Sequence, residues 1–273
     1  MSQSQSTADA SGADTASQPL LALKGFTKSF GPVEALKDVD LEVYRGEVLA
    51  LVGDNGAGKS TLIKAVSGAQ PADSGEATWE GRTTRLTTPH DATELGIATV
   101  YQDLALAENL DVVANLFLGQ EVVNTVPGVH VLDEVGMEQK SVELLSSLGV
   151  TTLRSVRTEV ASLSGGQRQA VAIARSLLGE PKMVLLDEPT AALGIVQTAQ
   201  ILKLIERLRE RGLGVIVISH NLANVFEVSD RIAVLRLGRL AATFKAGDAS
   251  REDIVASITG ADVRERATEE TPL

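Results

Sequence analysis

The chain contains no cysteine, which excludes a disulfide framework, a thiolate metal site and a cysteine nucleophile. It has no run of eighteen or more apolar residues, so the sequence predicts no membrane-spanning helix. Lysine and arginine are also scarce, since 25 of them face 36 acidic residues and the net charge is −11. Because Lys and Arg neutralise nucleic-acid phosphates, this balance argues against DNA or RNA as a partner.

Both ends of the chain lack the pattern of packed structure. Residues 1–18 are rich in Ser, Ala, Gln and Asp, which predicts a disordered tail, and they lack the basic start and apolar centre of a signal peptide. Residues 261–273 are similarly polar, and we expect a second tail there. No fixed-period repeat is present. Composition is ordinary for a globular protein, with 44% hydrophobic residues, and the length permits one large α/β domain or two small ones; we expect the packed part to span residues 19–260.

Short apolar runs alternate with helical patterns in this domain. The runs are typical of strands buried on both faces, and they cover Val48–Gly53, Gly96–Tyr101, Lys182–Asp187 and Gly214–Ser219. Helical patterns cover Lys59–Ser67, Glu134–Leu148, Gly166–Leu178 and Ile195–Arg211. The alternation predicts an α/β fold with a mainly parallel core sheet.

Two regions depart from that alternation. Leu20–Tyr44 and Glu76–Arg85 alternate with a period of two, which predicts an antiparallel β subdomain near the N-terminus. Residues from about 103 to 178 are mainly helical and are broken at Asn124–His130, which predicts an inserted helical subdomain. Trp79 is expected in the core of the N-terminal sheet, and His90 and His130 on the surface.

The stretch GDNGAGKST fits the pattern of a phosphate-binding loop, because it follows a predicted strand and opens a predicted helix. Its glycines let the backbone wrap a phosphate, and its amide groups face the anion. Lys59 places a cation at the β- and γ-phosphates, and the hydroxyl of Ser60 can ligate Mg²⁺. A plain glycine-rich turn is the alternative. The residues predicted to bind nucleotide are Gly53, Asp54, Asn55, Gly56, Ala57, Gly58, Lys59, Ser60 and Thr61.

Two adjacent carboxylates, Asp187 and Glu188, end another predicted strand, at the edge where open α/β sheets bind ligands. Because the chain turns there, both side chains can reach one pocket. We expect Asp187 to hold Mg²⁺ beside Ser60, and Glu188 to orient or deprotonate an attacking water. A solvated acidic pair is the alternative, and the phosphate loop on a second buried strand favours the functional interpretation.

A second anion-binding signal is LSGGQRQ, which places a serine and two glycines before a predicted helix. With it, the chain resembles the ATPase subunit of ATP-binding cassette (ABC) transporters over about Leu20 to Gly260. The motifs occur in the family's order: the phosphate loop, Gln102, LSGGQ, the MVLLDE stretch that ends at Glu188, and His220.

The resemblance implies a head-to-tail dimer that buries two ATP molecules. In it, Gln102 contacts Mg²⁺ and the attacking water, and His220 contacts the γ-phosphate. Phe30 lies where the family places an aromatic ring beneath adenine, and stacking there is physically reasonable. A plain core aromatic is the alternative for Phe30. The residues implied to face the partner's phosphate loop are Ser164, Gly165, Gly166 and Gln167.

One position departs from the family pattern. Many members carry an acidic residue at the end of the turn after the carboxylates, where it contacts the partner subunit, and this chain has Gly194. Glycine removes a hydrogen-bonding side chain and loosens the backbone, which affects how one site reports to the other. The DEPTAALG form resembles ATPases of importers for ribose, xylose and fructose. This chain carries one set of motifs, so it needs a second copy.

The resemblance therefore implies an ATP-hydrolysing subunit of a monosaccharide importer at the cytoplasmic face of the cell membrane. Its implied partners are a second ATPase subunit, separate transmembrane permease subunits and, indirectly, a solute-binding protein. One alternative is a soluble ABC-type ATPase not linked to transport, which the single cassette and the net charge of −11 disfavour. Another is a non-hydrolysing nucleotide-binding scaffold, which the intact Lys59, Glu188 and His220 disfavour.

Overall fold

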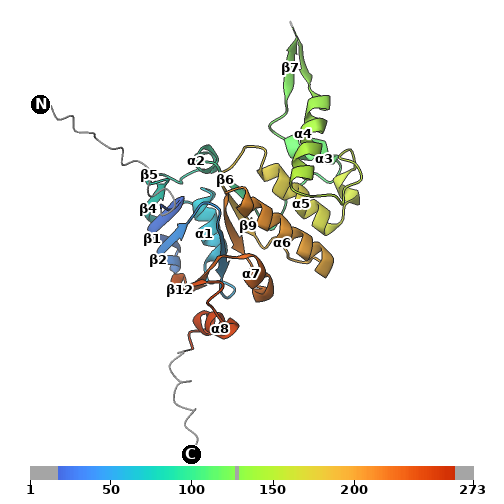
Figure 1. Cartoon of the computed structure of the whole chain (residues 1–273). Coiled ribbons are helices and arrows are strands. Elements are labelled where there is room, and N and C mark those ends of the chain that lie inside the picture. The colour runs from blue at the N-terminus through green and yellow to red at the C-terminus, as the bar shows by residue number, and fades with distance from the viewer. Residues whose placement is uncertain (1–17, 127–128, 262–273) are drawn as a thin grey trace, which may run out of the picture.

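A computed structural model of the chain describes residues 18–126 and 129–261. The two expected tails, residues 1–18 and 261–273, lie outside the described residues except for their innermost positions. Figure 1 shows three regions in the described part: a small sheet near the N-terminus, a central sheet, and a group of helices on the other side.

The central sheet has six strands in the order β12-β11-β3-β10-β9-β6. The first five in chain order run parallel, and only the last pairs antiparallel, with β11. Each apolar run of the sequence is one of these strands, which confirms the expected parallel core. Their bounds are β3 (Val48–Val52), β6 (Ile97–Val100), β9 (Met183–Asp187), β10 (Gly214–Ile218), β11 (Arg231–Arg236) and β12 (Arg239–Lys245).

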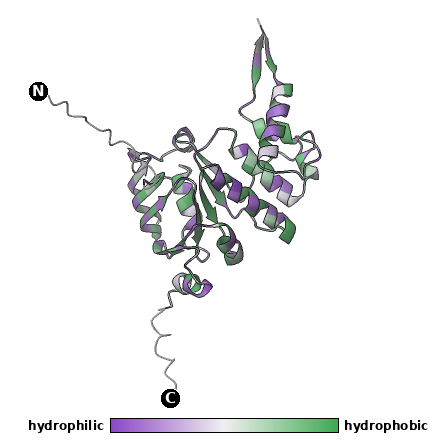
Figure 2. Ribbon diagram, viewed as in Figure 1, coloured by the Kyte–Doolittle hydropathy of each residue, from purple (hydrophilic) through white to green (hydrophobic). Residues whose placement is uncertain are grey.

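Alternate residues of the central strands enter different apolar clusters. In β9, Val184 and Leu186 pack into the cluster on the side of the helices, while Met183 and Leu185 pack toward the N-terminal sheet. Strand β10 alternates in the same way. Both faces are therefore covered, which explains why these strands are continuous apolar runs instead of apolar–polar alternations. Figure 2 shows the hydrophobic colour concentrated on these strands.

The N-terminal sheet has the order β2-β1-β4-β5, and its neighbours pair antiparallel as expected. Trp79 is only 4% exposed and belongs to the core beneath this sheet. The strands are β1 (Leu21–Phe30), β2 (Val33–Val43), β4 (Ser74–Trp79) and β5 (Arg82–Thr84).

The four predicted helices are present, each within two residues of its expected ends. They are α1 (Lys59–Val66), α4 (Glu134–Ser147), α5 (Gly165–Ser176) and α6 (Ile195–Glu210). Helices α3 (Val112–Phe117) and η1 (Val160–Ser162, a 3-10 turn) lie within the region expected to be mainly helical, and the helices that were not predicted are α2 (Pro89–Glu94), α7 (Leu222–Val228) and α8 (Arg251–Thr259). Helices α3, α4 and α5 share one apolar cluster with β9 and β10.

A hairpin stands where only a break between helices was expected. Strands β7 (Val123–Val126) and β8 (Val129–Leu132) pair antiparallel and extend away from the body of the molecule (Figure 1). The sequence did not predict this hairpin, because its apolar residues do not mark a buried face: Val123, Val131 and Leu132 are about half exposed. The boundaries of the helical subdomain, about 103–178, stay a prediction.

A buried side chain joins α3 to the segment before it. Asn115 is 0% exposed, and its Nδ2 donates to the carbonyls of Ala107 (2.9 Å), Asp111 (3.0 Å) and Leu110 (3.3 Å). Its Oδ1 accepts from the amide of Ala107 at 2.7 Å. The amide of Ala107 is thus paired with the Asn115 side chain, and the three carbonyls, which also accept backbone hydrogen bonds, are tied to α3 through it.

We predict that Asn115→Ala lowers the free energy of unfolding by about 2–4 kcal/mol, because it removes a fully buried side chain with four hydrogen bonds and leaves the amide of Ala107 without its acceptor. Urea unfolding followed by circular dichroism measures the loss. Asn124→Ala, at an exposed position, is the control and should change stability by less than about 0.5 kcal/mol. Equal effects of the two substitutions would contradict the role given to Asn115.

Candidate functional site

Four neighbouring strands of the central sheet end at one edge, and each is followed by residues that the sequence analysis singled out. Gly53 follows β3, His220 follows β10 after one residue, Glu188 follows β9, and Gln102 follows β6 after one residue. Parallel strands present their carboxyl ends at the same edge, so this strand order brings together residues that are far apart in the chain.

Two cavities open at this edge. The smaller, of ≈ 410 Å³, lies over the phosphate loop, and the larger, of ≈ 760 Å³, lies beside it. Asn55, Gln102 and Glu188 line both, so the cavities meet at these side chains. Every predicted phosphate-loop residue lines one cavity or the other except Ala57, which is 4% exposed and packs into the core.

The phosphate loop is closed by its own lysine. Lys59 Nζ donates to the carbonyls of Gly53 (2.7 Å) and Asp54 (2.9 Å). Burial lowers the pKa of Lys59, and nearby carboxylates oppose that shift. Gly58 has φ +107, and a Cβ there would lie 2.5 Å from the carbonyl oxygen of Ala35, so only glycine fits. The loop therefore holds a buried cation among backbone dipoles, which suits an anion such as a phosphate.

Ser60 and Asp187 offer hard oxygen atoms beside this lysine. Burial and the charge of Glu188 raise the pKa of Asp187, while Lys59, Lys64 and a hydrogen bond with Ser60 lower it. The described residues contain no group of three His, Cys, Asp or Glu side chains placed to hold a metal. A hydroxyl and a carboxylate, with the remaining ligands drawn from water and phosphate oxygens, fit Mg²⁺.

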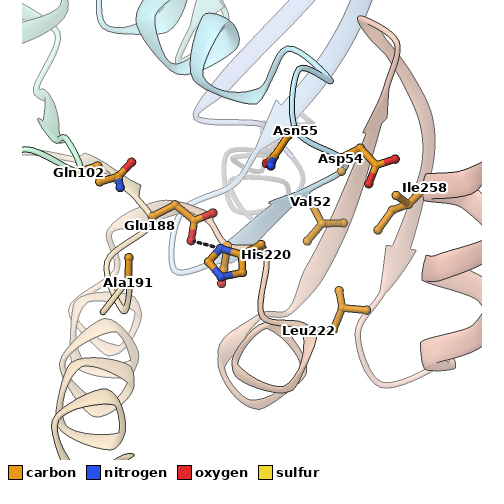
Figure 3. Close-up of a pocket in the computed structure, with 11 residues that line it drawn as sticks. Val52, Asp54, Asn55, Gln102, Glu188, Ala191, His220, Leu222 and Ile258 are labelled. Carbon is orange, nitrogen blue, oxygen red and sulfur yellow. Dashed lines mark hydrogen bonds and ion pairs between the residues drawn. The ribbon is translucent and has the colours of Figure 1, made fainter. Parts of the chain in front are cut away.

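Glu188 is held against His220. Glu188 Oε2 lies 2.9 Å from His220 Nδ1, and the carboxylate side chain is 15% exposed while the imidazole is 72% exposed. Glu188 has φ +52, a left-handed conformation that is strained for a residue other than glycine. Its amide donates to the carbonyl of Ile218 at 3.1 Å, and its carbonyl accepts from the amide of Ala191 at 3.1 Å. Figure 3 shows Glu188 between Gln102 and His220.

Phe30 is 45% exposed and lines the smaller cavity, so it is not the plain core aromatic that we kept as an alternative. His90 and His130 are exposed, as expected.

The loop of Ser164, Gly165, Gly166 and Gln167 lies away from both cavities. Ser164 Oγ accepts from the amide of Gln167 (3.3 Å), and Gln167 Oε1 accepts from the amide of Ser164 (2.9 Å), which caps the start of α5. A Cβ at Gly165 would lie 3.1 Å from the side chain of Leu193, and one at Gly166 would lie 2.9 Å from that of Gln197. Among the described residues, the structure therefore places this loop beside the turn that ends at Gly194, and not at the chain's own phosphate loop.

Gly194 does not need the conformational freedom of glycine. Its φ of −72 and ψ of 165 suit any residue, and the left-handed residue of the turn is Ala192, with φ 57. The amide of Gly194 donates to Gln197 Oε1 at 3.2 Å, at the start of α6. The backbone conformation here does not require glycine, so the difference that the structure shows at this position is the missing side chain.

The sequence analysis missed part of the larger cavity's wall. Val52, Leu222 and Ile258 form its apolar side, and Figure 3 shows Leu222 and Ile258 across from Glu188. Leu222 lies two residues after His220 and could have been inferred from that spacing. Ile258 comes from α8, and no motif in the sequence connects that helix with the site.

A loop between a buried strand and a helix, closed by lysine and flanked by strand-end carboxylates, defines a P-loop nucleotide-binding protein. The family model described as "ABC transporter" matches residues 36–191. The chain belongs to this family, and the expected fold class is confirmed.

Among curated proteins, the chain is 45% identical to the fructose import ATP-binding protein FrcA of Rhizobium meliloti, covering 90% of this chain and 96% of that one. It is 45% identical to the xylose/arabinose import ATP-binding protein XylG of Sulfolobus acidocaldarius, covering 88% and 94%. It is 40% identical to the ribose import ATP-binding protein RbsA of Caldanaerobacter subterraneus, covering 91% of this chain but 49% of that one.

Solved ABC cassettes have the same fold. A cassette in its ADP conformation is 27% identical with a TM-score of 0.74, covering 91% of this chain and 98% of that one. A dimeric cassette bound to ADP and phosphate after hydrolysis is 27% identical with a TM-score of 0.68, covering 83% and 98%.

We predict that Lys59→Ala weakens ATP binding by about 10- to 100-fold, because it removes a charged hydrogen-bond donor from the phosphate loop. Equilibrium binding of a fluorescent ATP analogue measures the change. Lys203→Ala, which removes an exposed lysine of α6, is the control and should leave affinity unchanged. If Lys59→Ala binds ATP normally, the phosphate-loop assignment is wrong.

Proposed function

We propose that this ABC ATPase is the energy-coupling subunit of an importer for a monosaccharide, and that two copies bind ATP head to tail. The observation that carries the proposal is the meeting of the phosphate loop, Gln102, Glu188 and His220 at one edge of the sheet. The named relatives import fructose, xylose or arabinose, and ribose, which supports a sugar as cargo and disfavours the soluble alternative.

In the proposed site, the phosphate loop binds the triphosphate of ATP, and Lys59 faces the β- and γ-phosphates. Ser60, Asp187 and Gln102 would hold Mg²⁺, which supplies positive charge between those phosphates when it is bound. Phe30 would stack against adenine from the open side of the smaller cavity. The exposure of Phe30 and its place on the cavity wall support this orientation.

Glu188 is the proposed general base. It accepts a proton from the attacking water as the water oxygen bonds to the γ-phosphorus and ADP leaves. His220 holds the carboxylate through its Nδ1 and would meet the γ-phosphate from the same position. The 2.9 Å contact and the strained backbone of Glu188 support a carboxylate held in one orientation.

The partner copy would complete each site. Ser164, Gly165, Gly166 and Gln167 line neither cavity in their own chain, although they form a helix N-terminus of the kind that binds anions. The similarity to a dimeric cassette that holds ADP and phosphate supports a pair of copies. In that pair, this loop of one copy faces the phosphate loop of the other.

The membrane-spanning part of the importer would belong to other subunits. Among the described residues, no helix is long and apolar enough to cross a bilayer. We propose that the chain binds permease subunits at the cytoplasmic face of the membrane through the segment after Gln102. A solute-binding protein would act through those subunits, and nucleic acid is not a proposed partner.

We predict that Glu188→Gln lowers steady-state ATP turnover by about 10²- to 10⁴-fold, because the amide cannot accept the proton of water. ATP binding should persist, and size-exclusion chromatography with MgATP should show a trapped dimer. Glu227→Gln, which changes an exposed carboxylate of α7, is the control. Normal turnover in Glu188→Gln would show that another group is the base.

We predict that Gly194→Asp changes the cooperativity of ATP hydrolysis and keeps the single-turnover rate within about twofold. The backbone conformation tolerates the substitution, because a Cβ at this position meets only Gln197 Oε1, at 3.9 Å. Gly194→Ala is the matched control, since it adds a Cβ without a carboxylate. A large fall in the single-turnover rate would mean that position 194 acts on the chemical step itself.

A further inference from the structure

The end of β1 that carries Phe30 has a strand partner on one side only. Strand β1 pairs with β4 only as far as Thr27 opposite Ser74. On its other side, Ser29 and Phe30 pair with β2, after register shifts between Phe26 and Lys28 and between Lys28 and Ser29. No strand therefore holds these last residues on the β4 side, where the pairing has ended, and the exposed ring of Phe30 lines the smaller cavity.

The carboxylate of Asp73 provides hydrogen-bond acceptors to the end of β1, beyond the last residue that pairs with β4. Its Oδ2 accepts from the amide of Ser29 at 2.7 Å, and its Oδ1 accepts from Lys28 Nζ at 2.7 Å. The amide of Asp73 donates to the carbonyl of Thr27 at 2.8 Å. The hydrogen bonds from Lys28 and Ser29 lower the pKa of Asp73, so the carboxylate is ionised at neutral pH.

Lys28 connects this carboxylate to the aromatic ring. Its side chain is 16% exposed, and its Nζ lies 5.7 Å from the centroid of the Phe30 ring. A cation at this distance is attracted to the face of an aromatic ring. Asp73 therefore holds both the backbone next to Phe30 and the cation that contacts its ring.

We propose that Asp73 and Lys28 are positioning residues for the base of the bound nucleotide. They hold the Phe30 ring so that its exposed surface faces the base. This proposal rests on the proposed role of Phe30 in stacking. Neither residue lines either of the two cavities, so each acts through Phe30 and not by touching the nucleotide. Their removal should weaken ligands that carry a base and leave phosphate-only ligands unaffected.

An ion pair that only stabilised the fold would give a different result. It would alter unfolding, and any effect on binding would be shared by ligands with and without a base. Comparing ADP with inorganic pyrophosphate separates the two roles, because both occupy the phosphate loop and only ADP carries adenine. ADP also avoids hydrolysis and the ATP-dependent dimer.

Titration calorimetry on the full chain tests the proposal with three variants. Lys28→Met should weaken ADP binding about threefold, as expected for loss of a cation–π contact. Asp73→Ala should weaken ADP binding about fivefold, because it also releases the amide of Ser29. The loss of ADP affinity in Asp73→Asn should lie between the losses in Lys28→Met and Asp73→Ala, since the Asn amide oxygen can still accept the hydrogen bond from Ser29. Pyrophosphate affinity should stay within about 1.5-fold in each.

Two further variants provide a control for loss of an ion pair and a separate test of the base site. Lys182→Met removes a matched ion pair, 2.8 Å from Glu80 and away from both cavities, and should leave both affinities unchanged. If Phe30→Ala leaves ADP affinity unchanged, the proposed base site itself fails. If Phe30→Ala weakens ADP binding while the variants of Asp73 and Lys28 do not, or weaken pyrophosphate equally, the positioning role is overturned.

Discussion

Burial of the parallel strands on both faces is the constraint on which the rest of this structure depends. Alternate residues of β9 and β10 enter different apolar clusters, so the strands cannot shift by one residue without exchanging the two cores. Their carboxyl ends are therefore fixed relative to one another. Polar residues such as Glu188 and His220 come directly after this rigid part of the chain, where a strained backbone and a 2.9 Å contact can persist.

The same constraint explains which parts of the site the sequence could predict. A strand buried on both faces is a continuous apolar run, and the residues that follow it must lie at the ligand-binding edge. The phosphate loop, Gln102, Glu188 and His220 each follow such a run, so their meeting was predictable before the order of the strands was known. Helix α5 was predictable because its apolar residues recur with a helical period and its start carries a cap, Ser164.

What the sequence could not predict depends on contacts that leave no periodic pattern. The hairpin of β7 and β8 leaves Val123, Val131 and Leu132 about half exposed, and Ile258 reaches the larger cavity only because α8 folds back beside it. Asp73 is an ordinary turn residue in the sequence, and its carboxylate bonds to Lys28 and Ser29 where β1 no longer pairs with β4. Gly194 adopts φ −72, which any residue can adopt, so its conformation does not explain why glycine stands there.

The net charge of the chain and the charges within the nucleotide site lead to different conclusions about ligands. A chain of net charge −11 is poorly suited to a polyanion that spreads over its surface, yet a nucleotide meets only the few groups within its own site. Here the anion would face the N-terminus of α1 and Lys59, whose Nζ is held inside the loop by two carbonyls. In the proposed mechanism the surrounding carboxylates would serve a different purpose, offering oxygens to Mg²⁺ and a base to water. Strongly acidic composition thus argues against nucleic acid as a partner and leaves ATP chemistry intact.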